Sequence, residues 1–152
     1  GANGGTPDAH RREPSTVGKT ATTGPVQRIK VMGGEYWDDV VAYACERNLT
    51  GIEALSKIPG FAGAAPVQNI GAYGQELADT FVSAEVYDTK EHQFKTLTKS
   101  DMQFSYRHSR LEDEGGIVLS AVFRLEEKPE TEVRALMQEL LQKRKKASFP
   151  VY

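Results

Sequence analysis

The feature that most constrains the fold is the apolar stretch from Gly116 to Glu127, GIVLSAVFRLEE. Alternate positions form one apolar face, which comprises Ile117, Leu119, Ala121, Phe123 and Leu125. The opposite positions include Val118 and Val122, so both faces carry apolar side chains. A period of two residues is that of a β-strand, and apolar residues on both faces indicate a strand that is covered on both sides.

Two other parts of the chain predict further strands. Val26–Met32 alternates between two faces and is followed by the glycine pair Gly33 and Gly34, which ends it. Residues 80–89 alternate in the same way, and residues 92–98 continue the pattern after a short turn. Two alternating runs joined by a turn predict an antiparallel hairpin.

Helical spacing occurs in two places. The first helix is predicted by Asp38 and Asp39, which favour a first turn, and by Asn48, a plausible stop. Its apolar positions are Trp37, Val40, Val41, Ala44 and Cys45. A final helix begins at Pro129 and carries Val133, Leu136, Met137, Leu140 and Leu141. A short helix over residues 52–57 is also expected. These elements predict an α+β fold, with a mainly antiparallel sheet and two or three helices.

The two ends of the chain differ from this pattern. Residues 1–25 are rich in Gly, Pro, Thr, Ala and charged residues, and we expect them to be flexible or disordered. The run Lys143–Lys146 is expected to be a solvated cationic helix end rather than a nucleic-acid patch. Residues 148–152 are read as a tail.

Composition limits the possible partners. The chain has 19 basic and 21 acidic residues, which gives no overall field that would attract nucleic acid or an anionic membrane. The single cysteine, Cys45, excludes an internal disulfide framework and is expected to be a core thiol. No apolar run approaches the ~20 residues of a membrane span, and no secretory signal is recognisable. We therefore expect a soluble, cytoplasmic protein.

The segment Ile58–Gly74, IPGFAGAAPVQNIGAYG, is the first candidate site. Its small residues leave backbone N–H groups accessible, and such groups can bind a pyrophosphate or the polar edge of a flat ring. The spacing matches neither GxGxxG nor GxxxxGK[ST]. A tight structural connection between a helix and a strand would explain the same composition equally well.

The second candidate site is Met102–Ser109, MQFSYRHS. An arginine among aromatic residues can bind an anionic substrate or stabilise a developing negative charge, which suggests a role for Arg107. Packing and a surface ion pair are the alternative interpretation. No orienting carboxylate is evident for His108, which we interpret as a bystander, and Ser109 as a turn or cap hydroxyl.

Together the two segments resemble the UDP-N-acetylenolpyruvoylglucosamine reductase (MurB) family, flavoenzymes of peptidoglycan precursor synthesis. The resemblance rests on the Gly51–Leu55 lead-in, the I-P-G turn at Ile58–Gly60, the A-P-x-Q-N-I-G-A-Y-G block at Ala65–Gly74, and Y-R-x-S at Tyr106–Ser109. It covers about residues 26–125.

This resemblance implies an α+β FAD-binding domain of the vanillyl-alcohol-oxidase (PCMH) type. FAD would be the cofactor and NADPH the reductant. The substrate would be UDP-N-acetylglucosamine enolpyruvate, in a cytoplasmic pathway that serves cell-wall biogenesis, cell shape and cell division. The full-length protein would be a monomer.

The same resemblance assigns roles to individual residues. Arg107 would be the catalytic residue that stabilises charge on the substrate carboxylate, and Tyr106 and Tyr73 would bind substrate. The implied cofactor-binding residues are Pro59, Gly60, Gly63, Ala64, Ala65, Pro66, Gln68, Asn69, Ile70, Gly71, Ala72, Tyr73 and Val118. No metal site is expected.

Residues 26–147 would then be the second half of the FAD-binding domain. The family's N-terminal flavin half and its C-terminal substrate domain, with a serine motif and a late glutamate, are not recognisable in the sequence. We therefore expect the isolated chain to be incomplete, to bind FAD weakly or not at all, and to have no turnover. Two alternatives stay open: a non-catalytic binding module that retains the fold, and another FAD-dependent oxidoreductase of the same fold.

Overall fold

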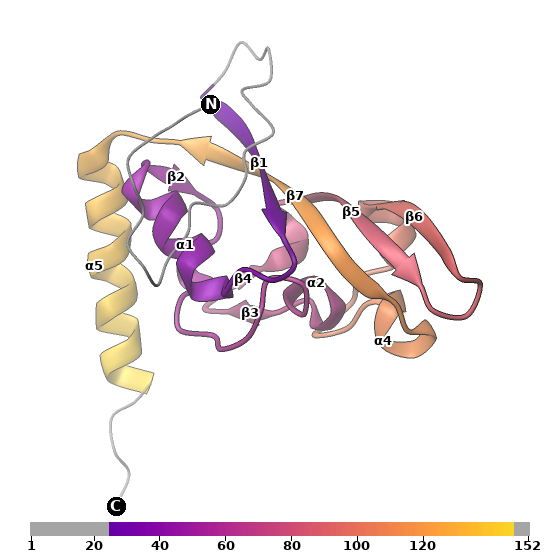
Figure 1. Ribbon diagram of the computed structural model, residues 1–152. Coiled ribbons are helices and arrows are strands. Elements are labelled where there is room, and N and C mark those ends of the chain that lie inside the picture. Colours follow the sequence, from indigo (N-terminus) through magenta and orange to yellow (C-terminus); the bar gives the residue numbers. More distant parts are fainter. Residues whose placement is uncertain (1–24, 148–152) are drawn as a thin grey trace, which may run out of the picture.

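The computed structural model describes residues 25–147, which form an α+β fold around one antiparallel sheet (Figure 1). The expected fold class is confirmed. The flexible segment expected over residues 1–25 lies outside the described residues except for Pro25, and the tail at residues 148–152 lies outside them as well.

The sheet has the strand order β1-β7-β5-β6, and β2 also pairs with β7. All of these pairs are antiparallel. The strands are β1 Val26–Met32, β2 Leu49–Thr50, β5 Phe81–Asp88, β6 Gln93–Thr98 and β7 Ile117–Glu127. The stretch with the strongest strand pattern is therefore the centre of the sheet, bonded to β1 on one side and to β5 on the other.

The expectation that β7 is covered on both faces is correct for only part of its length. Ala121, Phe123 and Leu125 are buried, whereas Ile117 and Leu119 on the same face are 54% and 37% exposed. Helix α1, Trp37–Glu46, packs against the buried part of the strand, where the rings of Trp37 and Phe123 meet. The exposed pair instead lines a surface cleft.

Helix α1, Trp37–Glu46, matches the prediction closely. Asp38 and Asp39 lie in its first turn. Asn48 follows the helix with a φ of 60°, the left-handed conformation that commonly stops a helix.

The helix predicted to begin at Pro129 is α5, Glu130–Ala147, and it lies beside α1 (Figure 1). Cys45 Sγ on α1 is 3.9 Å from the sulfur of Met137 on α5. Burial raises the pKa of the Cys45 thiol to about 11, and nearby carboxylates add to the increase. Cys45 is thus a half-buried thiol packed against the edge of the core, rather than a fully buried core thiol.

The remaining helical elements are short. They are η1 Glu53–Leu55, α2 Ala65–Gln68, η2 Leu77–Asp79, α3 Lys99–Met102 and α4 Arg110–Glu114. The helix expected over residues 52–57 is thus a single 3₁₀ turn. Across residues 25–147, no helix is long and apolar enough to cross a membrane.

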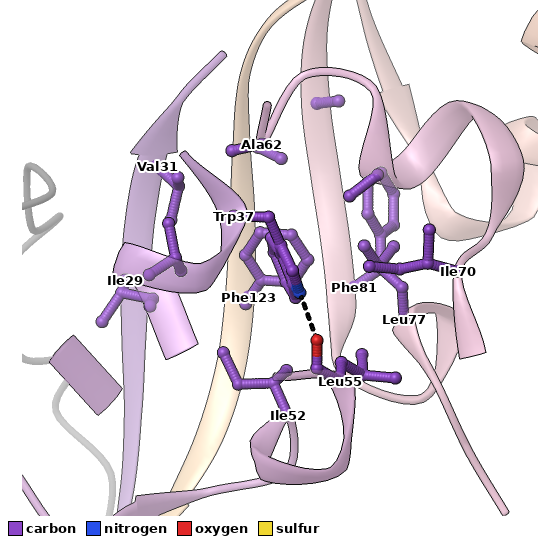
Figure 2. Packing of buried hydrophobic residues seen from close by; sticks show 14 of the residues in the cluster. Ile29, Val31, Trp37, Ile52, Leu55, Ala62, Ile70, Leu77, Phe81 and Phe123 are labelled. Carbon is purple, nitrogen blue, oxygen red and sulfur yellow. Dashed lines mark hydrogen bonds between the residues drawn. The ribbon is translucent and has the colours of Figure 1, made fainter. Parts of the chain in front are cut away.

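The core between α1 and the sheet is built around Trp37 (Figure 2). Its ring packs edge-on against Phe123 at 5.7 Å, and Phe123 in turn lies 6.2 Å from Phe81. The indole nitrogen donates a hydrogen bond to the Leu55 carbonyl at 3.1 Å. This bond fixes η1, and with it the beginning of the glycine-rich segment, against the core.

We expect Phe123→Ala to lower the free energy of unfolding by about 3–5 kcal/mol, because it removes a fully buried ring from between two others. Urea unfolding followed by Trp37 fluorescence measures the change. Phe94→Ala is the matched control, since Phe94 is 71% exposed. Similar losses in the two variants would contradict this description of the core.

Candidate functional site

The glycine-rich segment Ile58–Gly74 is an ordered structure rather than a plain loop. Its middle forms α2, in which Pro66 occupies the first turn. Its end forms a small hairpin in which β3 Gly71–Ala72 pairs with β4 Gln75–Glu76. Tyr73 and Gly74 make the two-residue turn, with φ of 51° and 79°.

The glycines of this segment fall into two groups. Gly60 and Gly74 have positive φ, so they serve the path of the backbone. Gly63 and Gly71 do not have positive φ. They are needed because other groups lie too close to their Cα atoms to leave room for a side chain. A Cβ on Gly63 would lie 2.9 Å from the Val118 carbonyl oxygen, and one on Gly71 would overlap the guanidinium of Arg107.

Asn69 holds the segment together. It is fully buried and has a φ of 45° where it ends α2. Its Nδ2 donates to the Ser105 carbonyl at 2.8 Å and to Glu76 Oε1 at 3.2 Å, and its Oδ1 accepts from the Ala78 N–H at 3.0 Å. Both ends of the amide are therefore used inside the protein, so its side chain fixes the turn.

A second set of bonds connects the hairpin to the lead-in at Gly51–Leu55. Gln75 Nε2 donates to Glu53 Oε2 at 2.8 Å, and Gln75 Oε1 accepts from the Ala54 N–H at 2.9 Å. Glu53, which is buried, also accepts from the Gly51 N–H at 2.7 Å. The two bonds made by Gln75 join parts of the motif that are separate in sequence.

An apolar cleft of about 590 Å³ lies between this segment and the exposed end of β7. Its lining residues carry no charge: Gly33, Gly34, Phe61, Gly63, Ala64, Val67, Gly116, Ile117, Val118 and Leu119.

Two backbone hydrogen bonds hold the cleft in shape. The Gly33 N–H donates to the Leu119 carbonyl at 2.7 Å, and the Gly33 carbonyl accepts from the Gly63 N–H at 3.0 Å. Phe61, which is part of the lining, stacks on Tyr36 with ring centroids 5.0 Å apart, and both rings are largely exposed. Glycine backbone and apolar side chains thus form a cleft suited to a flat, largely apolar group.

Arg107 lies at a second pocket, of about 370 Å³. It is part of a tight turn in which Ser105 and His108 exchange backbone hydrogen bonds of 3.0 and 3.2 Å. Its Nη1 is 4.0 Å from Glu76 Oε2, and its Cζ is 4.5 Å from the Tyr106 ring centroid. The guanidinium is thus placed by Gly71 below it and a carboxylate and an aromatic ring beside it.

The two residues after Arg107 have partners that sequence patterns did not reveal. Ser109 is fully buried, and its Oγ donates to the Val67 carbonyl at 2.6 Å, which ties the turn to α2. His108 Nε2 lies 3.0 Å from Asp113, and Nδ1 lies 3.5 Å from Ser105 Oγ. The statement that His108 lacks an orienting carboxylate is therefore wrong, because the start of α4 brings Asp113 to it.

The structure distributes the predicted site residues over four environments. Gly63, Ala64 and Val118 line the apolar cleft, whereas Gln68, Ile70, Gly71 and Arg107 line the second pocket. Exposed at the surface are Pro59, Gly60, Tyr73 and Tyr106. Ala65, Pro66 and Asn69 are buried, and Ala72 is half-buried in β3. The side chains of these four residues therefore pack inside the protein and line neither pocket.

Sequence reasoning missed the other wall of the cleft. Gly33, Gly34, Ile117 and Leu119 line it, although the glycine pair was interpreted only as the end of a strand. The available signal was two adjacent glycines directly after a predicted strand, a pattern that also indicates close approach of another backbone. Within residues 25–147, no group of three or more His, Cys, Asp or Glu side chains could hold a metal ion.

Comparison with known proteins identifies the protein family to which this fold and site belong. Residues 21–96 match the FAD binding domain family. Among curated proteins, the chain is 44% identical over 117 residues to the UDP-N-acetylenolpyruvoylglucosamine reductase of Streptomyces avermitilis and 47% identical over 105 residues to that of Agathobacter rectalis. These alignments cover 74% and 69% of this chain.

The solved structure of MurB from Thermus caldophilus aligns with a TM-score of 0.69 at 32% identity, over 76% of this chain and 42% of the other. The chain therefore belongs to the FAD-binding-domain family and, within it, to the UDP-N-acetylenolpyruvoylglucosamine reductases (MurB). It spans about a third of the length of the curated relatives, 32% and 33% of the two named above.

We expect Asn69→Ala to lower the free energy of unfolding by about 2–4 kcal/mol, because it leaves buried polar groups without partners and places Ala in a left-handed conformation. Urea unfolding measures the loss. Gln68→Ala is the control on the same helix, since Gln68 is exposed. A loss no greater than that of the control would contradict the role assigned to Asn69.

Proposed function

We propose that this chain is part of an FAD-dependent reductase that uses NADPH to reduce the enolpyruvyl group of UDP-N-acetylglucosamine enolpyruvate. The reaction would serve peptidoglycan precursor synthesis in the cytoplasm, and the full-length protein would be a monomer. The relatives named above support this proposal. The observation that carries it is the guanidinium of Arg107, held over Gly71 beside the pocket formed by the glycine-rich segment.

Within this proposal, residues 26–147 are the second half of the FAD-binding domain. The antiparallel sheet and the match over residues 21–96 support that assignment. The share of the relatives that is aligned, about a third, agrees with half of one domain in a longer enzyme.

The apolar cleft fits part of FAD. Its lining has no charged side chain, and a Cβ at Gly33 or Gly63 would overlap or crowd the Val118 carbonyl. Gly63, Ala64 and Val118 would hold the cofactor there, and the neighbouring backbone from Pro59 to Ala72 would support them. When bound, FAD supplies the hydride-transfer chemistry that protein side chains lack.

Arg107 would bind the carboxylate of the enolpyruvyl group. Reduction of a conjugated carboxylate builds negative charge on its oxygens, and a fixed cation lowers the energy of that charged state. The nearest carboxylate partner of Arg107, Glu76, is at the 4.0 Å limit of an ion pair. Glu76 is itself held by Asn69, so Arg107 is oriented without a tight ion pair that a substrate would have to break.

Tyr106 and Tyr73 would bind the substrate at the edge of the site. Tyr106 is 77% exposed beside Arg107, and Tyr73 is 40% exposed on the hairpin turn. Each presents an aromatic face and a hydroxyl to solvent, which suits a polar sugar nucleotide.

For the cofactor part of the proposal, we expect Leu119→Asp to weaken FAD binding at least about tenfold, because a carboxylate in the apolar cleft would be desolvated by the bound ring. Quenching of flavin fluorescence on titration with the flavin-free form of a full-length reductase that carries this segment measures the affinity. Ile117→Asn, in the same cleft but uncharged, should have a smaller effect, and Phe94→Asp on β6 should have none. Unchanged binding in Leu119→Asp would place the flavin elsewhere.

For the catalytic part, we expect Arg107→Lys, in a full-length reductase that carries this segment, to slow oxidation of the reduced flavin by the enolpyruvyl substrate about 10²-fold or more. Lysine keeps the positive charge but lacks the planar guanidinium that forms two parallel hydrogen bonds to a carboxylate. Flavin reduction by NADPH should change less than about twofold, and stopped-flow absorbance separates the two steps.

The control for this experiment is Arg110→Lys. Arg110 pairs with Glu114 at 2.8 Å on α4 and is not part of either pocket's lining. Substrate-dependent oxidation that proceeds normally in Arg107→Lys would show that Arg107 does not have the proposed role.

A further inference from the structure

Arg144, in the cationic end of α5, bonds to the backbone at η1, just before the glycine-rich segment, whereas Lys143, Lys145 and Lys146 are exposed. Arg144 Nη2 donates to the Ala54 carbonyl at 3.1 Å and to the Ser56 carbonyl at 2.9 Å. These carbonyls flank the one that accepts the Trp37 indole N–H. The expectation that the whole run Lys143–Lys146 is a solvated helix end is therefore wrong for Arg144.

The same guanidinium lies beside Tyr73. Its Cζ is 5.5 Å from the centroid of the Tyr73 ring, within the range of a cation–π interaction. Tyr73 is an unusual residue for its backbone conformation, because its φ of 51° crowds Cβ against the following carbonyl and costs about 1–2 kcal/mol. A bulky residue retained in a left-handed turn points to a use for its side chain.

Arg144 and the hairpin hold the same residue, Ala54, through its two backbone polar groups. The carbonyl of Ala54 accepts from Arg144, and the N–H of Ala54 donates to Gln75 Oε1 at 2.9 Å. Gln75 pairs with Ala72 directly across the turn that contains Tyr73. A continuous set of contacts thus runs from the last turn of α5 through η1 to the turn of the hairpin.

We infer that Arg144 is a positioning residue that fixes the Tyr73 ring for substrate binding and makes the end of α5 a part of the site. The inference rests on the proposed function for the role given to Tyr73. Arginine suits this task because one planar group bonds two carbonyls while it also faces an aromatic ring. Lysine is a single, strongly hydrated point charge and cannot reproduce both contacts at once.

The first test is hydrogen exchange, followed by mass spectrometry, on this chain and on Arg144→Ala and Arg144→Lys. We expect amides of residues 71–76 to exchange at least about fivefold faster in both variants, while β5 and β7 keep their protection. Lys143→Ala is the matched control, since Lys143 is on the same turn but pairs with Glu139 at 3.4 Å. Unchanged exchange in the hairpin, or equal acceleration in the whole sheet, would overturn the inference.

The second test separates positioning from a general structural role. In a full-length reductase that carries this segment, Arg144→Ala should raise KM for the enolpyruvyl sugar nucleotide about tenfold and leave kcat within about threefold. Tyr73→Ala should have a similar effect, and the double variant should add little to it, because both changes remove one unit. Additive effects, or rescue by Arg144→Lys, would overturn the inference.

The two tests fail in different ways. If the unaltered enzyme does not reduce the enolpyruvyl nucleotide, the proposed function fails, and the exchange experiment still decides whether Arg144 fixes the hairpin. If the enzyme is active but KM does not respond to Arg144→Ala, the proposed function stands and the inference is wrong.

Discussion

The side chain of Asn69 joins three separate parts of the chain at one buried point. Its amide bonds to Ser105, Glu76 and Ala78, and the first of these bonds spans 36 residues. Because Asn69 ends α2 in a left-handed conformation, the same residue also sets the direction in which the hairpin leaves. The two segments that carry the site's chemistry are therefore held together by one polar residue that has no exposed surface.

The position of Arg107 follows from this arrangement. Asn69 binds one carboxylate oxygen of Glu76, and the other oxygen faces Arg107. Gly71 leaves room for the guanidinium, and Ser109 ties the turn to α2 from the far side. All of these contacts come from residues next to the Arg107 turn in space, although most of those residues are distant in sequence. The arginine is therefore oriented by its immediate surroundings rather than by the sheet.

Much of the fold could be predicted because its signals are local. Alternation locates β1 and β7, and acids followed by an apolar stripe locate α1. The face of β7 could not be predicted, because Ile117 and Leu119 carry the same signal as Phe123. Whether an apolar residue lies in a core or lines a cleft depends on where α1 ends over the strand, which is a tertiary property.

The site was predictable to a similar extent and for a similar reason. Motifs located the glycine-rich segment and the Tyr106–Arg107 turn, since both are continuous in sequence. Partners that come from other elements were not visible: Gly33 approaches from the end of β1, Asp113 from α4, and Arg144 from α5. Spacing in sequence carries no information on such contacts until the elements are packed.

Backbone strain at the site is carried by residues with side chains rather than by glycine. Asn69, Tyr73 and Arg107 all have φ between 45° and 51°, whereas Gly63 and Gly71 do not need positive φ. Each such residue costs about 1–2 kcal/mol, and the cost is tolerated because surrounding bonds fix the conformation. Glycine at these three positions would relieve strain but would allow many backbone states, which ligand binding would then have to order. The strained residues therefore give a site that is already arranged before a ligand arrives, with the small residues between them providing the space for it.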